Sequence, residues 1–174
     1  DHVLALVDTH LKPRSRPRVQ DAIDLMLLCH IGQAPRADGR PYLEHTAEVA
    51  RNVADWVRPL DEDLVIAALL HDSVEDQATV LCRVGGHQSI SRRDALQTLE
   101  TQFGTRVAQV VSRLTNPHWP AGATRAEKNA LYLQHVETLA KNDEGAFAVK
   151  LGDFWTNALR VNAIGDSVVR QRLQ

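Results

Sequence analysis

The sequence contains 174 residues, 44% of them hydrophobic, and carries a formal net charge of −2 at pH 7. This length and composition predict one globular domain, residues 1–174, that buries a core without disulfide bonds. The small net charge provides no basic field for a nucleic-acid backbone, so we expect no nucleic-acid partner.

The cysteine content and the hydropathy pattern indicate the compartment. The two cysteines, Cys29 and Cys82, are too few for a disulfide framework and are typical of reduced thiols in a cytosolic protein. No apolar run reaches the roughly 18 residues that span a bilayer. We therefore expect a cytoplasmic protein with no membrane partner, and the sequence makes no prediction of its oligomeric state.

The first half of the chain predicts helices separated by polar turns. A short amphipathic segment over residues 3–11 ends in a basic connector that contains two prolines. Apolar residues then recur at helical spacing over 19–31 and again over 42–57. Asp61 is the expected N-cap of a further apolar helix, residues 64–71.

The second half of the chain also predicts helices. They cover residues 92–102 after Ser91, residues 107–114, residues 125–141 after Thr124, a last major helix that begins at Asp143, and a short helix over 168–173. No segment alternates apolar and polar residues as a half-buried strand does. The sequence therefore predicts an all-α fold of about eight helices in a single domain.

The apolar run over residues 67–70 ends in a cluster of ionisable side chains, His71, Asp72, Glu75 and Asp76. Burying an imidazole and a carboxylate at the end of a hydrophobic helix is unfavourable unless each finds a partner. Positions about one helical turn apart share a face, so Glu75 and Asp76 are expected to lie over His71 and Asp72. We interpret this cluster as part of a metal site.

Two more residues complete a ligand set. His45 lies in the first turn of the helix over 42–57, and Asp153 lies in an apolar segment near the end of the chain. A lone helical histidine is more often a core or surface residue than a ligand. With His71 and Asp72, however, these residues form a set of imidazoles and carboxylates without thiolates, which suits Mn²⁺ and disfavours structural zinc. We predict one divalent cation, Mn²⁺, per chain.

Several motifs follow one another in a specific order. Residues 41–45 read PYLEH, residues 71–76 read HDSVED and residues 150–157 read KLGDFWTN. With these motifs the chain resembles the HD hydrolase superfamily and, within it, the RelA/SpoT-type alarmone hydrolases, close to the single-domain small alarmone hydrolases, over about residues 22–161. The resemblance implies an HD-domain helical fold that hydrolyses the 3′-pyrophosphate of a purine alarmone nucleotide, releasing pyrophosphate and a nucleoside 5′-phosphate.

The resemblance also implies roles for side chains around the metal. Glu75 and Asp76 are the expected catalytic residues that orient or deprotonate water. Arg36 matches a family arginine that packs on the nucleotide, and a guanidinium suits both stacking on a base and pairing with phosphate. Three further residues are candidates for contact with this small-molecule substrate: Arg40 and Lys150 for the phosphates and Asn157 for the ribose or phosphate.

The chain departs from the family pattern around the expected nucleotide pocket. Ala37 and Asn116 stand where lysines are usual, Phe154 stands for an arginine and Arg160 for a threonine. Our hypothesis is that the chemistry is kept and the base preference is shifted from (p)ppGpp toward adenosine alarmones such as ppApp. An insertion over residues 81–90, with paired glycines that suggest a mobile tip, is either a lid over the phosphates or a solvated loop.

Two other functions are compatible with the sequence. One is a different HD-type phosphatase, acting on nucleoside monophosphates and releasing orthophosphate. The other is a catalytically silent alarmone sensor or antitoxin-like binder that uses the insertion to engage a partner. The intact Glu75 and Asp76 pair disfavours the silent protein.

Overall fold

The computed structural model describes residues 16–160, and every regular element in that range is a helix. In chain order the helices are α2 (Arg16–His30), α3 (Tyr42–Trp56), α4 (Glu62–Leu70), α5 (Ser73–Asp76), α6 (Ala78–Val84), α7 (Arg92–Phe103), α8 (Thr105–Leu114), α9 (Arg125–Asn142) and α10 (Glu144–Arg160). The predicted all-α fold is confirmed. The predicted segments 3–11 and 168–173 lie outside the described residues. Within residues 16–160, no helix combines the length and apolar character needed to cross a bilayer.

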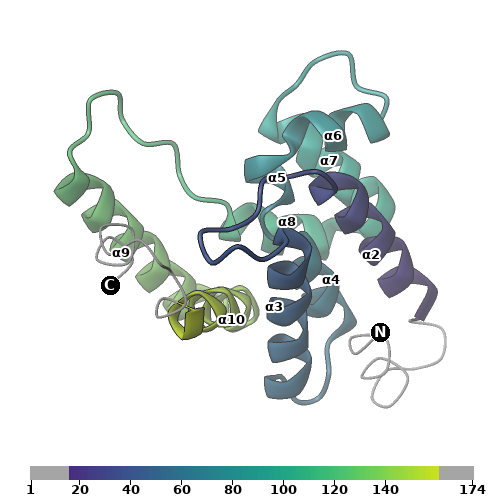
Figure 1. The fold of residues 1–174 in the computed structure, drawn as a ribbon, viewed down its shortest axis with the longest axis horizontal. Coiled ribbons are helices and arrows are strands. Elements are labelled where there is room, and N and C mark those ends of the chain that lie inside the picture. The colour runs from purple at the N-terminus through teal and green to yellow at the C-terminus, as the bar shows by residue number, and fades with distance from the viewer. Residues whose placement is uncertain (1–15, 161–174) are drawn as a thin grey trace.

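The core is built around α4, whose residues 64–70 are all buried. A helix that is apolar on every side must be covered on every side, and α2, α3, α8 and α10 pack around it (Figure 1). As predicted, Asp61 caps α4: its Oδ1 accepts hydrogen bonds from the N–H groups of Asp63 at 3.0 Å and Leu64 at 3.4 Å. This buried helix carries its C-terminal neighbours, His71 and Asp72, into the interior.

Helices α3 and α10 pack against each other as well as against α4. Their backbones approach closely at Gly152, where an added Cβ would lie 3.4 Å from Cγ1 and 3.5 Å from the carbonyl oxygen of Val49. A side chain larger than a methyl group would push the two helices apart, because the interior is close-packed. The close approach brings Asp153, the next residue in the chain, to the helix that carries His45.

The prediction of a loop over residues 81–90 was wrong for its first four residues, which belong to α6. Leu81 and Cys82 are buried, and the hydroxyl of Thr98 on α7 donates a hydrogen bond to the carbonyl of Leu81 at 3.0 Å. These apolar side chains hold the segment against α7, because exposing them to water would be unfavourable in free energy. The exposed turn is limited to the residues that follow, where Gly86 takes a positive φ of 71°.

Helix α10 begins at an N-cap formed by Asp143, which lies between α9 and α10. Its Oδ1 accepts a hydrogen bond from the N–H of Ala146 at 2.9 Å, and its Oδ2 pairs with Arg113 on α8. Partial burial opposes ionisation, but these partners outweigh it and hold the pKa of Asp143 below its usual value. The charged carboxylate therefore stabilises the start of the helix that bears Asp153.

Replacing Asp143 by alanine is expected to lower the free energy of unfolding at pH 7 by about 1 kcal/mol, the usual effect of losing an N-cap. Because the folded pKa is depressed, this contribution is complete above the unfolded value of about 3.9 and declines as the pH falls below it. Urea unfolding of the wild type and of Asp143→Ala, at neutral and at acidic pH, measures this difference in the free energy of unfolding. The exposed Asp55 supplies the control: an Asp55→Ala change as costly as Asp143→Ala would contradict the capping role.

Candidate metal centre

His71 and Asp72 follow directly on the buried helix α4. His71 is 4% exposed, and its Nδ1 lies 2.9 Å from the carbonyl oxygen of Ala68. Because a carbonyl only accepts, Nδ1 carries a proton and donates it. The other nitrogen, Nε2, points toward Asp72, with 3.1 Å between Nε2 and Oδ2.

His45 on α3 and Asp153 on α10 meet this pair. Nε2 of His45 lies 3.2 Å from Oδ1 of Asp153 and 3.8 Å from Oδ2 of Asp72. Oδ1 of Asp153 lies 3.9 Å from Nε2 of His71. The structure thus gathers the predicted ligands from α3, α10 and the C-terminal end of α4, and one ligand atom each from His45, His71 and Asp72 lies within 4.8 Å of the others.

The donor set fits a divalent cation. Nε2 of His45 and Nε2 of His71 are both buried, and neither has a hydrogen-bond partner within the described residues. Buried polar atoms are rarely left without a partner. Two imidazole nitrogens and two carboxylates that face one point without mutual hydrogen bonds are the arrangement expected of metal ligands.

The electrostatics of the cluster favour a cation. Burial disfavours the charged forms of Asp72 and Asp153, yet their partners, among them His71, hold both pKa values well below the usual range. Burial also opposes the charged form of His71, but the negative charge of Asp72 outweighs burial and raises the pKa of His71 to about 9. Burial lowers the pKa of His45. A metal ion and the second proton of His71 compete for the same lone pair on Nε2.

Neighbouring side chains hold the two carboxylates in place. The hydroxyl of Tyr42 donates a hydrogen bond to Oδ2 of Asp72 at 2.6 Å. On α10, the Lys150 ammonium donates to Oδ2 of Asp153 at 3.1 Å and the Asn157 amide donates to its Oδ1 at 2.8 Å. The structure therefore places Lys150 and Asn157 against a carboxylate of the cluster, and their contacts with substrate stay predictions.

Arg36 lies at the edge of the cluster, above an aromatic ring. Its guanidinium carbon is 5.3 Å from the centre of the Tyr42 ring, and the guanidinium donates a hydrogen bond to Asn157. On the same ring His30 stacks with 4.9 Å between ring centres. Sequence reasoning missed Tyr42, although its place three residues before His45, on the same face of α3, was an available signal.

The two predicted catalytic carboxylates are exposed and belong to the short helix α5. Glu75 accepts hydrogen bonds from the backbone N–H of Asn116 at 3.1 Å and from its side-chain amide at 3.2 Å. Asp76 accepts one from the amide of Gln33 at 3.2 Å. Residues of two separate loops, Gln33 between α2 and α3 and Asn116 between α8 and α9, thus fix the orientation of both carboxylates.

Arg40 lies apart from the other predicted site residues. Within the described part of the chain its guanidinium pairs with Glu44, at 3.5 Å, and with Glu48, at 3.7 Å, both on α3. Because consecutive turns of the same helix attract it, Arg40 is directed along α3, and its role in substrate binding stays a prediction.

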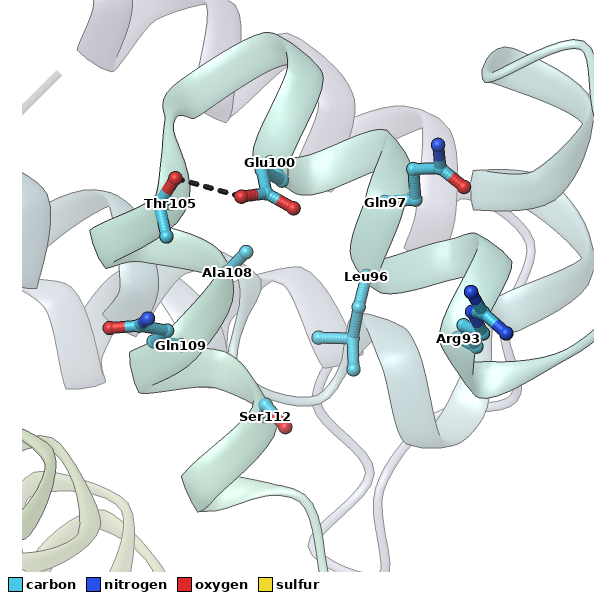
Figure 2. A pocket seen from close by; sticks show the side chains of 8 residues that line it. All are labelled: Arg93, Leu96, Gln97, Glu100, Thr105, Ala108, Gln109 and Ser112. Atoms are coloured by element: carbon cyan, nitrogen blue, oxygen red, sulfur yellow. Dashed lines mark hydrogen bonds between the residues drawn. The ribbon is translucent and has the colours of Figure 1, made fainter.

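A groove of about 630 Å³ lies elsewhere, between α7 and α8 (Figure 2). Arg93, Glu100 and Gln109 line it, and Glu100 accepts a hydrogen bond from the hydroxyl of Thr105 at 2.7 Å. None of the residues that line this groove belongs to the metal cluster, and none of them is a histidine. Volume alone does not make a reactive site, so the chemistry of the side chains points to the His45, His71, Asp72 and Asp153 cluster.

The chain is similar to several known proteins. The family described as HD domain matches residues 22–142. The zebrafish (Danio rerio) guanosine-3′,5′-bis(diphosphate) 3′-pyrophosphohydrolase MESH1 is 30% identical over 125 residues, which cover 72% of this chain and 58% of that protein. The Escherichia coli bifunctional (p)ppGpp synthase/hydrolase SpoT is 31% identical over 106 residues, which cover 61% of this chain and 12% of SpoT.

Among solved structures, a metazoan orthologue of SpoT, described as hydrolysing ppGpp, matches with a TM-score of 0.65 and 22% identity. The match covers 89% of this chain and 78% of that one. At this identity the likeness shows a shared fold. The chain spans less than two thirds of the length of the zebrafish and E. coli relatives.

Proposed function

This chain belongs to the HD-domain family, and from that premise we propose that it is a metal-dependent phosphohydrolase acting on the 3′-pyrophosphate of purine alarmone nucleotides. Water adds at the phosphorus bonded to the 3′ oxygen, the bond between them breaks, and pyrophosphate and a nucleoside 5′-phosphate leave. The relatives named as pyrophosphohydrolases support this assignment.

The observation that carries the proposal is the pair of buried histidine nitrogens that face two carboxylates and have no hydrogen-bond partner among residues 16–160. We assign His45, His71, Asp72 and Asp153 as the residues that would hold one divalent cation, and Mn²⁺ is the ion that this mixed nitrogen and oxygen set suits. When bound, such a cation polarises a phosphoryl oxygen and lowers the pKa of bound water.

Glu75 and Asp76 act on the proton of the attacking water. Both are exposed carboxylates one turn beyond the ligand Asp72, and both have their orientation fixed by neutral amide donors, Asn116 and Gln33. A carboxylate held by amides keeps free lone pairs for a proton. General-base assistance of this kind contributes about 10²- to 10⁴-fold in rate.

The nucleotide binds along the side of the cluster that Arg36 occupies. The guanidinium of Arg36 lies over the Tyr42 ring and next to Asn157, so its outer face is available to stack on a base. Lys150 supplies the cation nearest the ligand Asp153 and is assigned to the departing phosphates. Arg40 is assigned to the outer phosphates. To bind them, its guanidinium must break its ion pairs with Glu44 and Glu48 and form new ones with the substrate.

The base preference is proposed to favour adenosine alarmones such as ppApp. Asn116, which stands where the family has lysine, is occupied by Glu75 and offers no charge to a phosphate. Phe154, which stands where the family has arginine, is 61% exposed. Without a lysine at position 116 and an arginine at position 154, the contacts available to the nucleotide differ from those in the family, while the proposed metal ligands are the same.

Product analysis with a panel of 3′-pyrophosphorylated purine nucleotides, with and without Mn²⁺, tests the function. We expect pyrophosphate release that requires Mn²⁺ and a higher kcat/KM for ppApp than for ppGpp. Release of orthophosphate would identify a different HD phosphatase, and binding without turnover would identify an alarmone sensor. A strong guanosine preference would overturn the base assignment alone.

We further propose that the protein works in the cytoplasm. Cys29 and Cys82 are both buried free thiols, a state typical of reducing compartments.

A further inference from the structure

Thr156 connects the helix of Asp153 to the helix of His45. It is 3% exposed, and its Oγ1 lies 3.0 Å from the carbonyl oxygen of Gly152 and 2.8 Å from that of Asp153. The same oxygen lies 3.3 Å from Nδ1 of His45, a residue 111 positions away in the sequence. One hydroxyl therefore faces two carbonyl oxygens and one imidazole nitrogen.

The chemistry of these groups determines which of them donates. A carbonyl oxygen only accepts hydrogen bonds, and a hydroxyl has a single proton. The Thr156 proton is therefore donated to the carbonyl of Gly152 or Asp153, and the Thr156 oxygen is left to accept. Nδ1 of His45 must then be the donor, and in a neutral imidazole the other nitrogen, Nε2, holds a free lone pair.

The opposite tautomer of His45 would carry its proton on Nε2, which lies 3.2 Å from Oδ1 of Asp153. That tautomer would leave lone pairs of Nδ1 and of the Thr156 oxygen facing each other between two buried side chains, which is unfavourable. Thr156 and Asp153 thus compete for the position of one proton on the His45 ring.

We propose that Thr156 is a positioning residue that holds His45 in the tautomer protonated at Nδ1 and so keeps Nε2 open to a divalent cation. The inference rests on the metal assignment of the proposed function. Hydrogen-bond partners behind metal-ligating histidines commonly act in this way, and nothing in the sequence pattern singles out Thr156 for it.

His71 achieves the same arrangement through the backbone. Its Nδ1 donates to the carbonyl oxygen of Ala68, a group that no side-chain substitution removes. His45 instead depends on one hydroxyl, which a Thr156→Val substitution deletes while preserving the shape of the side chain. The two ligands are therefore separable by mutation.

Nuclear magnetic resonance of the metal-free protein tests the tautomer directly. Long-range proton–nitrogen spectra of the imidazoles identify which ring nitrogen of His45 is protonated. We expect Nδ1 in the wild type and in Thr156→Ser, which retains a hydroxyl, and a shift of the proton to Nε2 in Thr156→Val. A wild-type ring protonated at Nε2 alone would overturn the inference.

Calorimetric titration with Mn²⁺ tests the consequence for binding. Thr156→Val is expected to weaken Mn²⁺ binding by about 10- to 100-fold, the usual effect of losing such a partner, and Thr156→Ser is expected to restore it. Thr98→Val is the matched control, because the Thr98 hydroxyl is also buried but donates to the carbonyls of Leu81 and Asp94, neither of which belongs to the metal cluster. Thermal unfolding of each variant shows that it is folded.

The outcomes separate this inference from the proposed function. A wild-type chain that binds no Mn²⁺ overturns the proposed function. Wild-type binding that Thr156→Val leaves unchanged, or that Thr98→Val weakens equally, overturns the role of Thr156 alone.

Discussion

Replacing Asp72 by alanine is expected to abolish Mn²⁺ binding and to lower kcat/KM by roughly a thousandfold, since losing the metal removes about 4 kcal/mol of transition-state stabilisation. The Asp72 carboxylate faces the Nε2 atoms of both His45 and His71, with 3.8 Å and 3.1 Å between its Oδ2 and the two nitrogens. Its removal deletes one ligand and also the negative charge that attracts the cation. Metal content by mass spectrometry and steady-state pyrophosphate release measure the two effects.

Asp55→Ala serves as the control for Asp72→Ala. Asp55 is an exposed aspartate on α3, the helix that carries His45, and it faces away from the buried residues of that helix. We expect its variant to bind Mn²⁺ and to turn over substrate as the wild type does. Metal binding or activity that survives in Asp72→Ala would show that the ligand assignment is wrong.

Replacing Glu75 by glutamine is expected to lower kcat by about 10²- to 10⁴-fold while Mn²⁺ affinity is retained. The glutamine keeps the size of the side chain and an oxygen for the amide of Asn116, but it no longer takes up a proton. Because Glu75 is exposed, the thermal stability should change little. Separate measurement of kcat, Mn²⁺ affinity and the unfolding temperature distinguishes a chemical role from a structural one.

Glu137→Gln is the matched control for Glu75→Gln. Glu137 is an exposed residue of α9 whose partner is Lys141 in the next turn of the same helix. Its variant is expected to behave as the wild type. Unchanged kcat in Glu75→Gln would remove Glu75 from the mechanism and leave Asp76 as the candidate base.

Local patterns in the sequence were sufficient for the longer helices. Apolar spacing predicted α3, α7, α8 and α9 to within two residues at either end, and the caps Asp61, Ser91 and Thr124 each accept the hydrogen bonds expected of them. These features depend on residues a few positions apart, which is the range that periodicity and capping describe. The same patterns did not separate α5 from α4 and missed α6, because helices of one or two turns are held by tertiary contacts.

The motif spacing also pointed to residues that lie close together in the structure. His45, His71, Asp72 and Asp153 approach one another within 4 Å in pairs, and their role as metal ligands stays a prediction. Arg40 has a different setting. Its proximity in sequence to Arg36 predicts a second cation at the nucleotide. In the structure its guanidinium pairs with Glu44 and Glu48 on α3, and its role in substrate binding stays a prediction.

By itself the sequence determined the helical class, the caps and the choice of candidate ligands, because each follows from residues close together or from a motif in fixed order. Only the tertiary structure decided which groups support those ligands: Tyr42 on Asp72, Lys150 and Asn157 on Asp153, and Thr156 on His45. The contact between Thr156 and His45 depends on the packing of α3 against α10 at Gly152. Packing between helices distant in sequence sets distances to a fraction of an ångström, and no local pattern carries that information.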